Sequence, residues 1–207
     1  MKAGKMLDDS FKTIESRCTA EIKINRSKFI ANAFNVKSAK DAEEAVSCIK
    51  KTFFDARHHP FAYVLNDENV FRYNDDGEPG GSSGKPIYDA INKYGLKDVI
   101  VVVTRYFGGI KLGVGGLKRA YFESAEECLK LCKIIEIVKT KTVILRFPYS
   151  HINHVMRYLE REGIKLSGNN SGENAELVCE VRMSKLSTLE TELWDITKGN
   201  ITAEMSV

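Results

Sequence analysis

Cysteine motifs and long apolar runs are both missing from this sequence. The 207 residues include five cysteines, an odd number without a CxxC pair: Cys18, Cys48, Cys128, Cys132 and Cys179. This argues against a disulfide framework and a zinc knuckle, so we expect buried thiols in a reducing compartment. No apolar stretch reaches the length of a membrane helix, and the opening MKAGKMLDDSFKTIES has no apolar core of a secretion signal. We therefore expect a cytoplasmic protein that does not span a membrane.

A strong charge of either sign is also lacking, since the formal net charge is +3. Residues 1–135 carry 22 basic and 18 acidic side chains, whereas residues 136–207 carry 9 and 10. The small basic surplus therefore belongs to the first part of the chain. It is compatible with contact to phosphates, but avid nucleic-acid binders usually concentrate a larger basic patch. Composition alone does not predict nucleic-acid binding.

The first 135 residues alternate between strand and helix patterns. Residues 99–103 are five consecutive apolar residues, which predicts a strand covered on both faces. Helical spacing of apolar residues predicts three helices, the first with a capping-box-like start at Ser38. The expected elements are a hairpin at 22–36, a helix at 39–53, a hairpin at 61–73, a helix at 86–94, a central strand at 98–104 and a long helix after residue 116.

From residue 141 the element order changes to strand, helix, strand, strand, helix, strand. Gly163 is placed to stop the first helix, and the run 168–172 is rich in turn residues. This order is that of a ferredoxin-like βαββαβ unit. We therefore expect an α+β protein with a first domain at 1–135, a linker at 136–140 and a ferredoxin-like domain at 141–207.

Two glycine-rich segments carry most of the functional information. The first glycine-rich loop is residues 74–86 and the second is residues 107–116, and each precedes an expected helix. The free backbone N–H groups and the positive dipole end of a helix start suit an anion. We predict a phosphate-binding, RNA-binding or partner-binding rim made of Lys85, Arg105, Gly108, Gly109, Lys111, Gly113, Gly115, Gly116, Lys118 and Arg119.

Neither loop fits a nucleotide-binding fingerprint. Pro79 stands where a P-loop needs its first glycine, and Pro86 stands where it needs Ser or Thr after the lysine. The second loop lacks the last glycine of a dinucleotide motif. The alternative reading of these glycines is that they permit tight turns and close packing of helices on the sheet.

Acidic residues and histidines offer a weaker candidate site in the first loop and its surroundings. Carboxylates and imidazoles could form a metal or hydrolytic site, but acidic turn residues commonly cap nearby N–H groups. No catalytic triad, metal-ligand set or cofactor motif is readable, so we expect no catalytic residues, no metal and no cofactor. The loop residues that remain candidates for a functional role are His58, Asp75, Asp76, Glu78, Ser82 and Ser83.

The stretches DDGEPGGSSGKP at 75–86 and VIVVVTRYFGGIKLGVGGLKRAY at 99–121 closely resemble the signature region of the IMPACT/YigZ family. SKFIA at 27–31 and ARHHPFAY at 56–63 extend the resemblance over nearly all of the first domain. The sequence departs from the family pattern at Ser82-Ser83, where Thr-Ala is usual, and at His59-Pro60, where an Asn-Cys-type pair is usual. The resemblance implies a first domain like the second domain of ribosomal protein S5. It also implies a second domain like the last domain of the large translocating elongation factor.

The resemblance implies a translation-associated binding or regulatory protein. In this interpretation the glycine-rich basic rim contacts RNA, the ribosome or a translation-linked protein, and a role confined to protein contacts is poorly separated from it. The alternative is a phosphate-handling enzyme, a small-molecule kinase or hydrolase that uses the loop from Asp75 to Lys85, because the S5-like fold also occurs in such kinases. The sequence does not indicate the oligomeric state.

Overall fold

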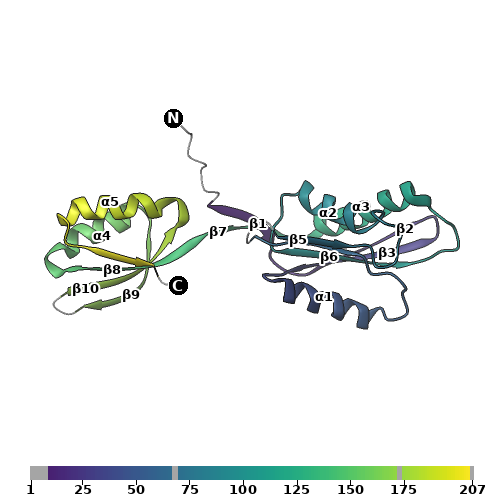
Figure 1. The fold of residues 1–207 in the computed structure, drawn as a ribbon, viewed down its shortest axis with the longest axis horizontal. Coiled ribbons are helices and arrows are strands. Elements are labelled where there is room, and N and C mark those ends of the chain that lie inside the picture. Colours follow the sequence, from purple (N-terminus) through teal and green to yellow (C-terminus); the bar gives the residue numbers. More distant parts are fainter. Residues whose placement is uncertain (1–8, 67–69, 172–173, 206–207) are drawn as a thin grey trace, which may run out of the picture. The chain divides into compact units, whose positions relative to one another are not determined.

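The computed structural model describes residues 9–66, 70–171 and 174–205. The chain divides into two compact units, one of Phe11–Ile137 and one of Val138–Val207 with the chain before Phe11. Figure 1 shows each unit as a sheet covered by helices. No helix in the described part of the chain is long and apolar enough to cross a membrane.

The N-terminal unit is built on one antiparallel sheet of five strands in the order β2-β3-β6-β4-β5. Helices α2 and α3 cover one face of this sheet and α1 covers the other (Figure 1). The predicted hairpins, helices and central strand of this region are present, with ends that differ by a few residues. The bounds are β2 Cys18–Ile24, β3 Ser27–Asn35, α1 Ala39–Thr52, β4 Phe61–Val64, β5 Phe71–Asn74, α2 Gly84–Lys93, β6 Val99–Tyr106 and α3 Gly113–Leu131.

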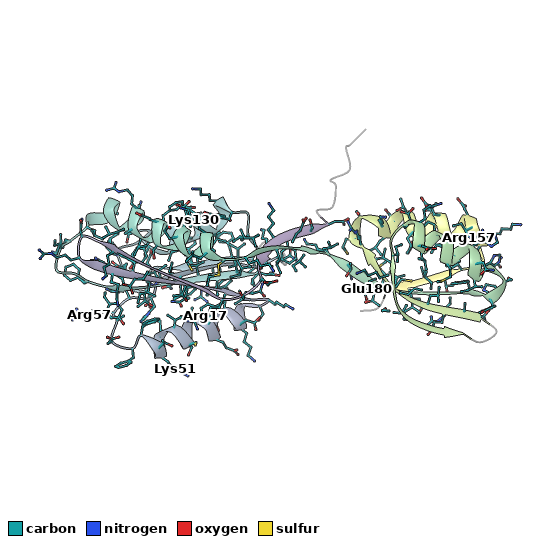
Figure 2. All side chains as sticks on the ribbon, turned by 180° about the vertical axis from the view of Figure 1, so that it is seen from behind. Arg17, Lys51, Arg57, Lys130, Arg157 and Glu180 are labelled. Carbon is teal, nitrogen blue, oxygen red and sulfur yellow. A yellow bond between two sulfur atoms is a disulfide. The ribbon has the colours of Figure 1, made fainter. Side chains whose placement is uncertain are left out.

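Strand β6 is central because its side chains are apolar on both faces. Val99, Val101 and Val103 belong to the core under α2 and α3. Ile100 and Val102 belong to the core under α1. Successive side chains of a strand point to opposite faces, so the uninterrupted apolar run at 99–103 supplies both cores at once. Figure 2 shows side chains on both sides of this sheet.

The C-terminal unit has a four-stranded antiparallel sheet in the order β11-β8-β10-β9. With one helix between the first and second strands and another between the third and fourth, this is the ferredoxin-like arrangement that the element order predicted. Alternate residues of β8 and β10 are buried against the helices. The bounds are β8 Thr140–Pro148, α4 Ile152–Arg161, β9 Lys165–Ser171, β10 Asn174–Arg182, α5 Leu186–Thr197 and β11 Thr202–Met205.

The segment 136–140, expected as a linker, contains the point at which the two compact units divide and is made largely of strand residues. Residues 136–138 belong to β7, Ile134–Val138, and residue 140 begins β8. Strand β7 pairs with β1, Ser10–Ile14, in a separate two-stranded sheet. The two strands are about 120 residues apart in the chain, so local patterns give no sign that they pair.

The expectation of unpaired thiols is corrected by the structure. Cys18 at the start of β2 and Cys132 after α3 form a disulfide, with Cα atoms 5.5 Å apart. Cys48, Cys128 and Cys179 are free thiols. Burial raises the pKa of Cys128 to about 11 and that of Cys179 to about 11, so both remain protonated. An odd number of cysteines allowed one pair, and folding brings these two together across 114 residues.

Candidate functional site

The second glycine-rich loop connects the end of β6 to the start of α3. Gly108 lies against the turn between β2 and β3, where a side chain would overlap the backbone of Arg26 and Ser27. Its N–H donates to the Ser27 hydroxyl at 3.2 Å. Gly109 and Gly113 have φ of +85° and +69°, a region that favours glycine. Glycine is therefore needed here for close approach and for turning.

Three glycines that were expected in the second glycine-rich loop belong to helix α3 instead. Gly113, Gly115 and Gly116 lie in the first turn of α3, which begins at Gly113. The residue before it, Leu112, has no side chain that can accept a hydrogen bond, and the first turn holds no acidic residue. The first N–H groups of a helix have no partner within the helix. The α3 start therefore presents uncapped donors and a positive dipole end.

A cleft of about 590 Å³ opens beside this helix start. Its walls come from residues 55–58, the first glycine-rich loop, the end of β6 and the first turns of α3. Arg57, Arg105 and Lys111 are its cations, and Asp55 and Glu78 are its carboxylates. Among the described residues, Lys111 has no ion pair or side-chain hydrogen bond, and its side chain is exposed.

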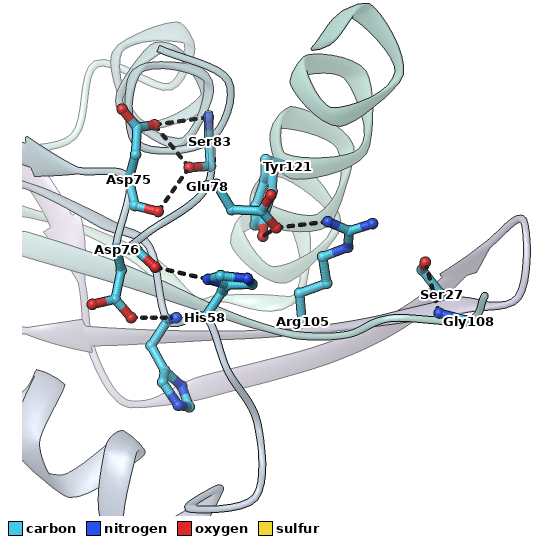
Figure 3. A network of polar contacts seen from close by, with 10 residues as sticks. Ser27, His58, Asp75, Asp76, Glu78, Ser83, Arg105, Gly108 and Tyr121 are labelled. Carbon is cyan, nitrogen blue, oxygen red and sulfur yellow. Dashed lines mark hydrogen bonds and ion pairs between the residues drawn. The ribbon is translucent and has the colours of Figure 1, made fainter. Parts of the chain in front are cut away.

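The floor of the cleft contains the buried side chains of Glu78 and Arg105, and Tyr121 contacts Glu78 (Figure 3). Glu78 Oε1 accepts hydrogen bonds from Arg105 Nη1 at 2.7 Å and from the Tyr121 hydroxyl at 2.7 Å. The side chains of Arg105 and Glu78 are only 9% and 4% exposed. Burial, together with the charge of Glu78, raises the pKa of Tyr121, so its hydroxyl stays a donor.

Arg105 keeps unused hydrogen-bonding capacity although it forms this ion pair. Its Nε is buried without a hydrogen-bond partner, and within the described residues its Nη2 donates to no acceptor. The guanidinium also lies against aromatic rings, 5.6 Å from the ring centroid of Phe29 and 5.5 Å from that of Phe107. Arg105 is therefore a fixed, partly satisfied cation at the cleft floor.

His58 contributes an imidazole to the wall of the cleft. Its Nδ1 is 2.8 Å from the backbone carbonyl of Asp76 (Figure 3). Because a carbonyl oxygen can only accept, Nδ1 carries the proton, and Nε2 holds the lone pair when the ring is neutral. The neighbouring His59 is buried, and its Nδ1 is 3.0 Å from the Thr104 hydroxyl. Burial lowers the pKa of His59, which indicates a neutral packing residue.

In the first glycine-rich loop, the carboxylate of Asp75 closes the start of α2. It accepts from the N–H groups of Gly81 at 2.8 Å, Ser83 at 3.0 Å and Gly84 at 2.8 Å, and from the Ser83 hydroxyl at 2.8 Å. Burial of Asp75 acts to raise its pKa, but these hydrogen bonds outweigh it and the pKa is lowered. Ser82 is fully buried, and its hydroxyl has no partner in the described structure.

Asp76 joins three segments of the N-terminal unit. One carboxylate oxygen accepts from Lys50 Nζ of α1 at 2.8 Å, and the other accepts from the backbone N–H of His59 at 2.7 Å. Burial opposes ionisation of Asp76, yet these contacts lower its pKa overall. Asp75 and Asp76 thus hold the loop in place as anions.

The predicted rim divides into two surfaces. Arg105, Lys111 and Gly113 line the cleft. Lys85, which pairs with Asp89, lies one residue before Pro86 at the α2 start. Pro86 helps line an open depression between α2 and α3 that is more acidic than basic. The charged residues of that depression are Asp89, Lys118, Arg119, Glu123, Glu126, Glu127 and Lys130.

Arg57 and Phe107 of the cleft, and Tyr121 behind Glu78, were not predicted from the sequence. Tyr121 looked like a core residue of α3, and only its hydroxyl contact with Glu78 links it to the site. Arg57 and Phe107 are exposed cleft residues that adjoin His58 and Gly108 in the chain. Arg57 and Phe107 could have been predicted from the sequence because they lie next to motif residues. Within the described residues, no group of three or more His, Cys, Asp or Glu side chains could hold a metal ion.

The described elements define a two-unit α+β protein, with helices on both faces of a five-stranded antiparallel sheet in the N-terminal unit and a ferredoxin-like C-terminal unit. A family model described as the Impact N-terminal domain matches residues 25–129. IMPACT family member YvyE of Bacillus subtilis is 33% identical over 191 residues, which cover 92% of this chain and 88% of that protein. The chain therefore belongs to the IMPACT family.

Two further comparisons extend over both units. IMPACT family member YigZ of Escherichia coli is 28% identical over 183 residues, which cover 86% of this chain and 89% of that protein. The crystal structure of a hypothetical protein aligns with a TM-score of 0.67 at 25% identity, covering 97% of this chain and 98% of that one. Nearly the whole length of the chain thus shares its fold with a solved structure.

Proposed function

We propose that this chain is a translation-associated, cytoplasmic binding protein whose N-terminal unit contacts RNA phosphates at the cleft. The uncapped start of α3 beside the unpaired Lys111 is the observation that carries the proposal. Helix N-termini bind anions through free N–H groups and the dipole, and a lysine adds a full positive charge. The expected likeness of the C-terminal unit to the last domain of the translocating elongation factor belongs to the same proposal.

The roles of the acidic residues favour binding over turnover. Asp75 closes the α2 start, Asp76 joins α1 to the loop, and Glu78 is paired with Arg105. A general acid or base must be within hydrogen-bond reach of a substrate, whereas these carboxylates already accept hydrogen bonds from groups of the protein itself. The first glycine-rich loop therefore supports the cleft wall rather than supplying catalytic groups.

Salt-dependent RNA binding tests this proposal. Each phosphate neutralised by a cation adds roughly 0.7 to the slope of log affinity against log salt for a single strand. Lys111→Ala should weaken binding of a single-stranded RNA and lower that slope by about one such contact. Lys118→Ala is the matched control, because it removes the same charge from the depression between α2 and α3. Fluorescence anisotropy at several salt concentrations measures both quantities.

Absence of RNA binding at low salt would contradict the proposal, as would equal effects of the two lysine substitutions. The second candidate is a phosphate-handling enzyme, and His58 favours it because its Nε2 can accept a proton within the cleft wall. Turnover of nucleotides or phosphomonoesters by the purified protein, lost in His58→Gln with folding intact, would establish the enzyme in place of the binding protein.

A further inference from the structure

We infer that the cleft binds the terminal phosphate of a nucleotide, with the base against Phe107. The inference rests on the proposed anion-binding role of the cleft and narrows its ligand to a phosphomonoester with an aromatic base. A free nucleoside monophosphate and the phosphorylated end of an RNA chain share this chemistry.

Two independent features of the cleft point to the phosphate. The first is the α3 start, whose first-turn N–H groups have no capping side chain. The second is Arg105, which is 8% exposed and lines the cleft while its Nε has no partner. Because only Nη1 of the guanidinium donates to Glu78, its other N–H groups remain available to a second oxyanion.

The cleft has a small positive surplus, which attracts a doubly charged anion more strongly than a singly charged one. Arg57, Arg105 and Lys111 face two carboxylates, and both of these already accept hydrogen bonds. Asp55 accepts from the Tyr106 hydroxyl at 2.7 Å, and Glu78 accepts from two donors. A terminal phosphate carries close to two negative charges at neutral pH, whereas an internal phosphodiester carries one.

The opening of the cleft suits an aromatic base. Phe107 and Val114 are 59% and 51% exposed, so apolar surface stands beside the phosphate donors. The Arg105 guanidinium lies 5.5 Å from the ring centroid of Phe107, which holds the ring in place. Any of the nucleic-acid bases can stack on such an exposed aromatic side chain, because every base has a flat π-face.

The size of the cleft suits a single nucleotide. Its volume of about 590 Å³ lies within the range of small-ligand sites, roughly 300–1,000 Å³. At its floor the buried side chains of Arg105 and Glu78 form an ion pair. A cleft of this size holds a single nucleotide.

Calorimetric titration of the full-length protein tests the inference with AMP, adenosine and inorganic phosphate. AMP should bind, adenosine should not bind measurably, and phosphate should bind more weakly than AMP. Lys111→Ala should weaken AMP binding by about tenfold, since a charge-assisted hydrogen bond is lost. Phe107→Ala should weaken AMP binding but leave phosphate binding unchanged. Lys118→Ala and Phe71→Ala, at exposed positions outside the cleft, should leave AMP binding unchanged.

RNA oligonucleotides of one sequence, with a 5′-phosphate or a 5′-hydroxyl, separate the two sources of the ligand. Preference for the phosphorylated oligonucleotide assigns the cleft to RNA ends, and binding of AMP without such a preference assigns it to free nucleotides. Equal binding of AMP and adenosine, or no binding of AMP, overturns the inference. If both oligonucleotides then bind equally and depend on Lys111, the proposed RNA-binding function still stands. If neither binds, both proposals fail.

Discussion

The two glycine-rich loops look alike in sequence, but their helices begin in different ways. Each loop presses one glycine against backbone, Gly84 against Asn74 and Gly108 against Arg26. The start of α2, however, is closed by the carboxylate of Asp75, while the start of α3 follows Leu112 and has no such group. The first loop supplies its own anion, and the second leaves the place for an anion open.

This difference shows how a scaffold and a binding site can share one local motif. A helix start whose donors are satisfied within the protein is rigid and has little left to offer a ligand. A helix start without a cap keeps its donors and its dipole for an external group. The loops are therefore not two halves of one rim, because only the second presents its helix start to the cleft.

The largest expected effect comes from breaking the close approach in the second loop. Gly108→Ala should lower the free energy of unfolding by about 3 kcal/mol, because its Cβ would overlap the backbone of Arg26 and Ser27. Gly115→Ala is the matched control in the first turn of α3, where a Cβ meets no atom within 4 Å. It should be neutral or stabilise by roughly 0.5 kcal/mol. Urea unfolding measures both, and equal losses would show that Gly108 is not a packing glycine.

Removing the Asp75 carboxylate from the first glycine-rich loop should have a smaller effect on stability. Asp75→Ala removes the acceptor of three backbone N–H groups and should cost about 2 kcal/mol of unfolding free energy. Asp75→Asn retains one carbonyl acceptor and should cost less. Chemical denaturation of the three proteins checks the order, and an unchanged midpoint in Asp75→Ala would remove the basis for contrasting the loops.

Lowering the pH should also reduce the stability of the wild-type protein, because it protonates Asp75. The folded pKa of Asp75 lies below its ordinary value of 3.8, so its stabilisation is complete above that value and disappears as pH falls through the folded pKa. Unfolding measured between pH 5 and pH 2 should therefore be less pH-dependent in Asp75→Asn than in the wild type. The same slope in both proteins would show that Asp75 is not the titrating group.

The smallest effect on stability should come from closing the second loop with a carboxylate. Gly113→Asp places a negative charge at the α3 start, where the added Cβ meets no atom within 4 Å. The dipole should offset much of the cost of the positive φ, so stability should change by less than about 1 kcal/mol. AMP affinity should fall by about tenfold, the size expected for one lost charge-assisted contact.

Gly113→Asn is the uncharged control, since Asn also tolerates positive φ. It should keep most of the AMP affinity. Equal affinities of Gly113→Asp and Gly113→Asn would show that the α3 start is not the phosphate position. Calorimetric titration and thermal unfolding of the two variants provide the measurements.

Local patterns predicted most elements because each depends on nearby residues. The capping box at Ser38 and Asp41 begins α1 as expected, and the apolar run of 99–103 became the central strand. Strands β1 and β7 and the Cys18–Cys132 disulfide were missed because each joins segments more than 110 residues apart. Pairing over such a distance leaves no periodic signal in either segment.

The site was predicted in its parts but not in its arrangement. Lys111 and Arg105 were recognised as cations near a glycine-rich loop, yet the salt bridge from Arg105 to Glu78 crosses 27 residues and was not foreseen. Lys118 and Arg119 were placed on the same rim, although they line the depression between α2 and α3. Charge and position in the chain indicate which residues could bind an anion, but not which of them share a surface.

Hydrophobic period and turn chemistry are local, so the sequence was enough to predict the order of most elements, the buried strand β6 and the two glycine-rich helix starts. The packed fold was needed to show that Asp75 closes one helix start, while the other opens on a cleft with Arg105 at its floor. Hydrogen bonds and burial depend on which distant groups the packed sheet and helices bring within about 3 Å of one another.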